Sequence, residues 1–279
     1  MSHFTKLGLL SVTTGYLLLL PYLSAAKLII KGSDTLGAKL VPQLAEVFSA
    51  SYPLAGEALT IEIAAEGSAT GIASVLDGTA DIGMLSRGLR PEEIEEALSR
   101  GLDLALIEVA RDALVVVVHP GNPLKSLTLS ELAAVFTGDV VNWAALSDFP
   151  EPISAYSRNS SSGTYEAFQQ LALNARNYSS QIQKMASNEQ IAHEVSGNPA
   201  GIGYVALAYA QNPTIRMLPI NGSTATAKDY PLARPLFFLF NRDAENNPLG
   251  EAFIDFTTSE AGQAVVTKLE FLPAQSDDS

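Results

Sequence analysis

The sequence contains no cysteine, which excludes disulfide bonds and lipid attachment at a lipobox cysteine. Only three histidines are present, and the two beyond the N-terminal segment, His119 and His193, are not at metal-ligand spacing. There is no HExxH motif and no GxxxxGKS/T loop, so neither a zinc hydrolase nor a nucleotide-binding protein is indicated. We therefore expect no metal site and no cofactor. The single tryptophan, Trp143, is expected to serve packing and not to stack on a ligand.

Long hydrophobic runs are also missing, except for one at the N-terminus. Lys6 precedes an apolar stretch from Leu7 to Leu20, and the small residues Ser24, Ala25 and Ala26 follow. This pattern is typical of a secretory signal peptide covering residues 1–26; the alternative is an uncleaved N-terminal anchor.

Positive charge is scarce. The chain has 17 lysines and arginines against 30 aspartates and glutamates, a formal net charge of −13. Removal of the signal peptide makes the charge one unit more negative, because that segment carries Lys6 and no acidic residue. An acidic surface argues against nucleic acid and anionic lipid as partners. Local hydrogen bonds would have to hold any anionic ligand, so its binding should depend only weakly on salt.

β-type runs alternate with helical runs along the chain, which predicts an α/β protein with parallel strands. The segment from Asp103 to Pro120 predicts two close strands, and the segment from Gly250 to Leu269 predicts an amphipathic helix. Apolar strands near Val115 and Phe237 are candidates for segments that pass between two lobes.

Three times a β-type run ends in a cluster of glycine, serine and threonine that leads directly into a helix. Each cluster places hydroxyl groups and unpaired backbone N–H groups at a helix N-terminus, where the helix dipole favours an anion. One such turn is an ordinary helix cap, and plain N-capping is the alternative for Ser33, Ser68 and Thr164. Three turns together, with Arg158 in the last, indicate one oxyanion held from several sides. These runs cover residues 27–40, 59–76 and 152–171.

Six segments in a characteristic order carry a family resemblance. The most recognisable is Leu127–Leu146, a helix followed by Phe-Thr-Gly and then Asn142-Trp143. The others are GSDTL (Gly32–Leu36), EGSATGI (Glu66–Ile72), DIGMLSRGL (Asp81–Leu89), SRNSSSGTYEAF (Ser157–Phe168) and NPAGIGYV (Asn198–Val205). Together they resemble the periplasmic phosphate-binding proteins that feed ABC importers, the PstS-like family.

The resemblance implies a two-lobed Venus-flytrap fold, the type II periplasmic-binding-protein fold, with two crossovers and the ligand in the cleft. The first lobe would hold residues 27–112 plus 235–279, and the second lobe residues 113–234. It further implies a monomeric periplasmic receptor without enzymatic activity, which binds inorganic phosphate and docks on an inner-membrane ABC permease.

The same resemblance assigns phosphate-binding residues to both lobes. In the first lobe, Thr35 and the N–H groups around it would donate hydrogen bonds. In the second lobe, Arg158 would bind two oxygens of the ligand, its alternative being a surface or salt-bridging arginine. The full set is Ser33, Asp34, Thr35, Leu36, Ser68, Ser86, Arg87, Arg158, Ser162, Gly163 and Thr164.

Selectivity requires an acceptor as well as donors, because phosphate carries a proton near neutral pH and sulfate does not. Many family members have aspartate where this chain has Arg87 and Ser160. Asp34 is the remaining candidate acceptor, and its alternative is a turn or N-cap aspartate. Arg87 is interpreted either as a second cationic contact to the ligand or as the partner of Asp34.

Three other functions stay open at this stage. The ligand could be another oxyanion, such as sulfate, molybdate or tungstate. The chain could also be a secreted sensory or interaction protein with the same fold. A phosphate-ester hydrolase based on Ser162 is least favoured, because no base for the serine is evident in the sequence.

Overall fold

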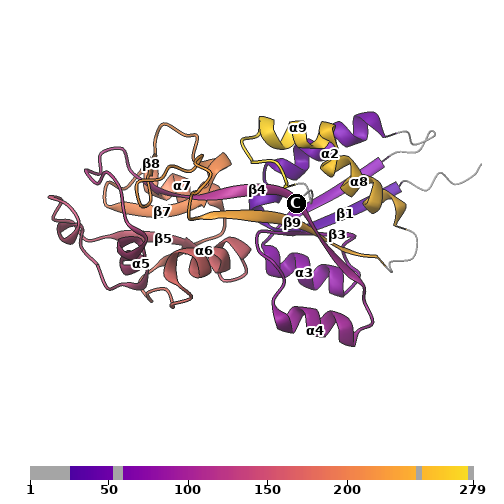
Figure 1. Cartoon of the computed structure of the whole chain (residues 1–279), viewed down its shortest axis with the longest axis horizontal. Helices are drawn as coiled ribbons and strands as arrows, with labels where there is room; N and C mark the ends of the chain where they lie inside the picture. Colours follow the sequence, from indigo (N-terminus) through magenta and orange to yellow (C-terminus); the bar gives the residue numbers. More distant parts are fainter. Residues whose placement is uncertain (1–25, 53–58, 243–246, 276–279) are drawn as a thin grey trace, which may run out of the picture.

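The computed structural model describes residues 26–52, 59–242 and 247–275. The predicted signal peptide, apart from its last residue, Ala26, lies outside these ranges. Figure 1 shows two groups of elements, the first lobe and the second lobe, joined by the long strands β4 (Leu104–Val118) and β9 (Ala233–Asn241). The predicted two-lobed α/β fold with two crossovers is confirmed.

The first lobe is built on three parallel strands, with β1 between β2 and β3. Helices α2, α8 and α9 lie on one side of these strands, and α3 and α4 lie on the other (Figure 1). The elements are β1 (Ala26–Gly32), α1 (Asp34–Gly37), α2 (Leu40–Ser51), β2 (Leu59–Ala65), α3 (Ser68–Leu76), β3 (Ile82–Leu85), α4 (Pro91–Ser99), α8 (Pro248–Thr258) and α9 (Glu260–Lys268).

The second lobe repeats the α/β plan. Strand β5 lies parallel to both β6 and β7, whereas β7 and β8 run antiparallel to β4. The elements are α5 (Leu129–Thr137), the 3-10 helix η1 (Trp143–Ala145), β5 (Ser154–Arg158), α6 (Gly163–Leu173), β6 (Gln183–Met185), α7 (Asn188–Ser196), β7 (Gly201–Ala206), the 3-10 helix η2 (Leu207–Tyr209) and β8 (Arg216–Leu218).

Strand β4 runs through both lobes. Its first part pairs with β9 as far as Ala113, and its last part, from Leu114 to Val118, pairs with β7. The prediction of two separate strands here is therefore wrong: the polar residues near its middle lie within one 15-residue strand. The apolar segments near Val115 and Phe237 do connect the lobes, as predicted. The predicted limits at residues 112/113 and 234/235 fall inside these strands and stay a prediction.

The single helix predicted near the C-terminus forms as two shorter helices, α8 and α9. The C-terminal helix is interrupted at Ser259, whose extended backbone ends α8 and whose Oγ accepts a hydrogen bond from the Gly262 N–H at the start of α9. Within the described ranges, no helix is long and apolar enough to cross a membrane.

An aromatic cluster forms the centre of the second lobe, between α5, α6 and β7. The rings of Phe168 and Tyr204 stack with centroids 3.7 Å apart, and Phe136 packs edge-on against both. Trp143 is fully buried and donates from Nε1 to the Ala200 carbonyl, which confirms its packing role. The cluster supports the helix whose N-terminus faces the first lobe, α6.

Replacement of Phe136 by alanine should destabilise the protein strongly. Phe136→Ala leaves a cavity beside Phe168 and Tyr204, and we expect it to lower the free energy of unfolding by about 3–5 kcal/mol. The control Leu98→Ala changes a side chain that is 70% exposed and should cost less than about 0.5 kcal/mol. Urea unfolding followed by circular dichroism measures the free energy of unfolding of both variants. Equal decreases in the two variants would contradict the packing of Phe136 against Phe168 and Tyr204.

Candidate anion-binding site

The predicted site residues come from the ends of strands at the boundary between the lobes. Residues 33–36 follow β1, Ser68 begins α3 after β2, and Ser86 follows β3. From the second lobe, Arg158 ends β5 and Ser162 precedes α6. All the serine and threonine candidates are at most 2% exposed. Leu36 and Gly163 are also buried.

Hydroxyl groups from both lobes form one buried cluster. Thr35 Oγ1 in the first lobe lies 3.0 Å from Thr164 Oγ1 in the second, within hydrogen-bond distance. The hydroxyls of Ser33 and Ser86 are hydrogen-bonded to each other. Ser68 Oγ accepts a hydrogen bond of 3.0 Å from the Ser86 N–H. The structure therefore brings together side chains that the sequence placed at separate helix starts.

Glycine allows the two lobes to approach closely at this cluster. A Cβ atom on Gly163, at the start of α6, would lie 2.3 Å from Ser68 Oγ. Gly67 precedes α3 with φ +125°, and a Cβ there would lie 2.6 Å from the Ser161 carbonyl oxygen. That carbonyl accepts a hydrogen bond from the Ala69 N–H. The N-termini of α3 and α6 thus meet across the boundary.

Plain capping does not account for most of these hydroxyls. Ser162 does cap α6, because its Oγ accepts a hydrogen bond from the Thr164 N–H. Ser33 stands at the N-cap of α1 but makes no side-chain cap bond, and the N-cap of α3 is Gly67 and not Ser68. The hydroxyl of Thr164 contacts Thr35 in the other lobe. Capping as the role of Ser33, Ser68 and Thr164 is therefore wrong.

Arg158 is 1% exposed at the end of β5, so the interpretation as a surface arginine is wrong, whereas that as a salt-bridging arginine is confirmed. Its Nη2 donates to the Ala186 carbonyl, and its Nη1 lies 3.1 Å from Asp34 Oδ2, an ion pair between the lobes. Its Nε has no hydrogen-bond acceptor in the described part of the chain. Burial lowers the pKa of Arg158 and the Asp34 charge opposes this, but arginine stays charged.

Asp34 joins the lobes through a residue that sequence reasoning missed. Its Oδ2 accepts hydrogen bonds from the backbone N–H and from Nδ2 of Asn188, at 3.0 and 2.8 Å. Asn188 is the first residue of α7, where unpaired N–H groups and the helix dipole favour a carboxylate. The Asp34 carboxylate therefore bonds to the other lobe, and its interpretation as only a turn or N-cap aspartate is wrong. Its role as a ligand acceptor stays a prediction.

Arg87 is not the partner of Asp34, and that interpretation is wrong. Its guanidinium makes two hydrogen bonds of 2.8 Å to Glu93, and its Nε lies 2.8 Å from Glu166 Oε2 in the second lobe. Glu93 is the third residue of α4, and its carboxylate also accepts from the Arg90 N–H in a capping box. The helix start thus brings a carboxylate to Arg87. A direct contact of Arg87 with ligand stays a prediction.

A second buried arginine, Arg234, was absent from the predicted set. Arg234 on β9 and Asp112 on β4 are opposite each other in the register, 3% and 1% exposed, and form an ion pair of 2.9 Å. Burial lowers the pKa of Arg234 and raises that of Asp112, and each charge opposes the shift of the other. The available signal was charge inside two apolar strands: Arg234 in β9, and Asp112 beside Glu108 and Arg111 in β4.

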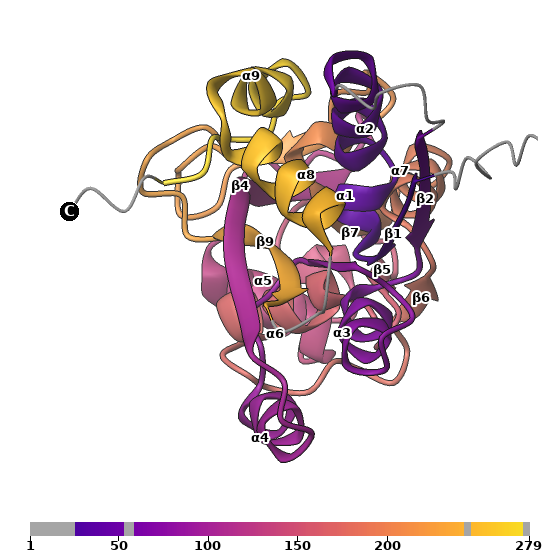
Figure 2. The same ribbon diagram turned by 90° about the vertical axis from the view of Figure 1, so that its right-hand side faces the viewer.

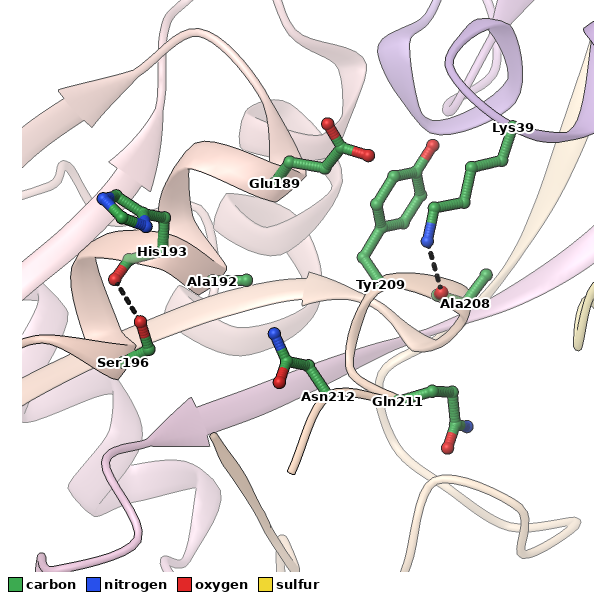
Figure 3. A pocket seen from close by; sticks show the side chains of 9 residues that line it. All are labelled: Lys39, Glu189, Ala192, His193, Ser196, Ala208, Tyr209, Gln211 and Asn212. Carbon is green, nitrogen blue, oxygen red and sulfur yellow. Dashed lines mark hydrogen bonds between the residues drawn. The ribbon is translucent and has the colours of Figure 1, made fainter. Parts of the chain in front are cut away.

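A separate cavity of about 300 Å³ lies between α7 and the segment after η2 (Figure 3). Lys39 reaches it from the first lobe, donates from Nζ to the Ala208 carbonyl and lies over the Tyr209 ring. Among the described residues, no group of three or more acidic or histidine side chains could hold a metal ion. None of the predicted site residues lines the cavity, whose walls are Lys39, Glu189, Ala192, His193, Ser196, Ala208, Tyr209, Gln211 and Asn212.

The ion pairs of Glu93 give a pH-dependent contribution to stability. Burial alone would raise its pKa, but the hydrogen bonds from Arg87 and Arg90 outweigh burial and lower the pKa from 4.5 to about 2. Because the folded pKa is depressed, this contribution is full above about pH 4.5 and is lost as the pH falls toward 2. We expect Glu93→Gln to cost about 1–3 kcal/mol at pH 7.

Urea unfolding at pH 7, 5, 4 and 3 would measure this effect, with Glu95→Gln as the control because Glu95 lies exposed on the same helix. The difference between wild type and Glu93→Gln should shrink as the pH falls through this range. A difference of constant size would show that the charge of Glu93 does not stabilise the fold.

Comparison with known proteins agrees with this geometry. Residues 23–261 match the model of the PBP superfamily domain. The chain is 30% identical over 267 residues to the phosphate-binding protein PstS of Pseudomonas aeruginosa, covering 87% of this chain and 81% of that protein. It is 29% identical over 223 residues to the phosphate-binding protein PstS of Borreliella burgdorferi, covering 75% and 77% of the two chains.

A solved structure extends the likeness to three dimensions. The putative phosphate ABC transporter substrate-binding protein of Clostridium perfringens, with bound phosphate, has a TM-score of 0.81 and 30% identity, covering 89% of this chain and all of that one. An ABC-type phosphate transport receptor of Vibrio cholerae shares the fold, with a TM-score of 0.72 and 23% identity over 88% of this chain and 99% of that one. This chain therefore belongs to the PBP superfamily and, within it, to the PstS-like phosphate-binding proteins.

Proposed function

We propose that this protein is an extracytoplasmic receptor that binds inorganic phosphate between its lobes and delivers it to an ABC importer. The observation that carries the proposal is the buried guanidinium of Arg158, whose Nε finds no acceptor in the described part of the chain. A buried N–H donor without a partner is costly, and a ligand oxygen would satisfy it.

The chemistry around Arg158 suits a tetrahedral oxyanion. Hydroxyls from the start of α1, the residue after β3, and the starts of α3 and α6 cluster at the lobe boundary, and the N-termini of α3 and α6 meet there. Arginine offers a planar pair of donors to two oxygens, and helix starts offer backbone N–H groups and a favourable dipole. These local donors would hold the anion despite the formal charge of −13, so salt should weaken binding only slightly.

Ligand binding would favour the closed arrangement of the lobes. Only that arrangement joins the donors of both lobes to one anion, so the ligand would shift the population toward it. Contacts between the lobes, such as Asp34 with Asn188 and Arg87 with Glu166, would form at the same time. An ABC permease of the inner membrane could then recognise the closed receptor in the periplasm.

We assign no catalytic role to the site. Ser162 caps α6 through its Oγ, and in the cluster the Ser33 hydroxyl is paired with Ser86 and that of Thr35 with Thr164. A nucleophilic serine requires an adjacent base, and none of the hydrogen bonds of Ser162 supplies one. The protein would therefore act as a carrier of its ligand, and we propose separately that it does so as a monomer.

Replacement of Arg158 provides the first test of the proposed phosphate binding. In titration calorimetry of refolded, phosphate-stripped residues 27–279, we expect phosphate to bind tightly and sulfate to give no heat. Arg158→Ala should weaken phosphate binding at least about 100-fold, because it removes a charge-assisted pair of bonds. The control Arg176→Ala changes an exposed arginine paired with Asp139 and should leave the affinity unchanged. If neither phosphate nor sulfate gives heat of binding, we would conclude that the chain is a sensory or interaction protein and not a phosphate receptor.

The acceptor role of Asp34 is tested by selectivity. Asp34→Asn removes the negative charge that would accept the phosphate proton and repel sulfate, so the preference for phosphate should fall. Asn188→Ala is the matched control, because it loses the side-chain bond between the lobes but keeps the carboxylate. That control should weaken phosphate binding but still leave sulfate without binding heat, so the preference for phosphate is kept. Unchanged selectivity in Asp34→Asn would favour a site for sulfate, molybdate or tungstate, whose binding is measured in the same way.

A further inference from the structure

The guanidinium of Arg234 contacts both lobes and the strand that connects them. Its Nη2 donates to Thr164 Oγ1 in the second lobe at 3.0 Å and lies 3.4 Å from Thr35 Oγ1 in the first. Its Nη1 donates to the Ser86 carbonyl at 3.0 Å, and Nε and Nη2 both donate to Asp112 Oδ2. A single side chain thus connects the two threonine hydroxyls at the centre of the candidate site.

The direction of these hydrogen bonds follows from the chemistry of the groups. A guanidinium has five N–H donors and no acceptor, so the oxygens of Thr35 and Thr164 must be the acceptors in their contacts with Arg234. Each hydroxyl carries one proton, and that proton has to point away from the guanidinium. Because the two oxygens lie 3.0 Å apart, one proton can bridge them and the other is left to donate elsewhere.

The orientation of Arg234 is itself held by the connecting strands. Asp112 lies directly opposite it across the β4–β9 pair, and the other oxygen of Asp112, Oδ1, accepts a hydrogen bond from the Leu207 N–H. Arg234 is 3% exposed, so its guanidinium has little room to turn away from the two threonines. Its place therefore depends on the backbone of the connecting strands and not on a flexible loop.

We propose that Arg234 is a positioning residue for the ligand: it holds the hydroxyls of Thr35 and Thr164 as acceptors, so that the one proton that does not bridge them points toward a bound phosphate oxygen. The inference deepens the proposed function and rests on it, because it assigns to the same site a residue outside the expected binding set. Preorganised donors bind an anion better than freely rotating ones, since less conformational freedom is lost on binding.

A purely structural ion pair would give different results. If Arg234 only stabilised the fold, its replacement would lower thermal stability and affect phosphate binding independently of the threonines. If it orients the threonine hydroxyl, removal of that hydroxyl should abolish most of the effect of Arg234 on affinity. For a structural role, the fold-changes in phosphate affinity caused by replacing Arg234 and the threonine should multiply in the double variant. For an orienting role, they should not multiply.

The experiment is a double-mutant cycle on phosphate affinity, measured by titration calorimetry on full-length mature protein. We expect Arg234→Lys and Thr164→Val each to weaken phosphate binding by about 10- to 100-fold. The double variant should bind phosphate with about the same affinity as the single variant that binds it less tightly. In the control cycle, Arg234→Lys is combined with Ser33→Ala, because the Ser33 hydroxyl bonds to Ser86 Oγ, whereas Arg234 bonds to the Ser86 backbone carbonyl and to the threonine hydroxyls. There the fold-changes should multiply.

Multiplying fold-changes in the Thr164 cycle would overturn the inference while leaving the proposed function intact. Absence of phosphate binding by the wild-type protein would overturn both. Thermal unfolding without phosphate checks that each variant is folded. Should Arg234→Lys fail to fold, the pair Asp112→Leu with Arg234→Met replaces both charges by apolar groups, a change that buried ion pairs often tolerate. A folded pair variant with wild-type phosphate affinity would also overturn the inference.

Discussion

The antiparallel pairing of β4 with β9 is the constraint on which the rest of the structure depends. Both strands pass from one lobe to the other and belong to one continuous sheet, in the order β2-β1-β3-β9-β4-β7-β5-β6. Figure 2 looks along the molecule from the side of the first lobe, with elements of the second lobe such as β7 and α6 behind it. Because the strands hold the lobes side by side, the helix starts of both lobes meet at one boundary.

An acidic protein of this kind can bind an anion only through local chemistry. Its two buried arginines, Arg158 and Arg234, are each paired with an aspartate, so the charges near the hydroxyl cluster are balanced before a ligand arrives. Balanced pairs reduce the cost of burying each guanidinium but leave N–H groups free to donate. The Nε of Arg158 is such a group in the described part of the chain. Specific hydrogen bonds, not the overall field, then determine what binds.

Much of the candidate site could be predicted from local patterns. Glycine, serine and threonine before each helix predicted donor groups near Ser33, Ser68 and Ser162, and these residues do lie at the boundary. The break at Ser259 was missed because a serine cap inside an amphipathic pattern resembles continuous helix. The partners of Arg87 were missed because Glu93 lies on the next helix, α4, and Glu166 lies in the other lobe, so no local pattern placed either carboxylate beside the guanidinium.

The sequence by itself determined the elements: apolar runs became strands, helix starts carried hydroxyls, and two apolar strands connected the lobes. These features depend on the backbone preferences and periodicity of neighbouring residues. Only the tertiary structure decided which side chains meet. Asp34 contacts Asn188 across 154 positions, and Asp112 contacts Arg234 across 122. Such contacts depend on strand register and lobe packing, which no local pattern encodes, because residues far apart in the chain become neighbours only when the sheet is complete.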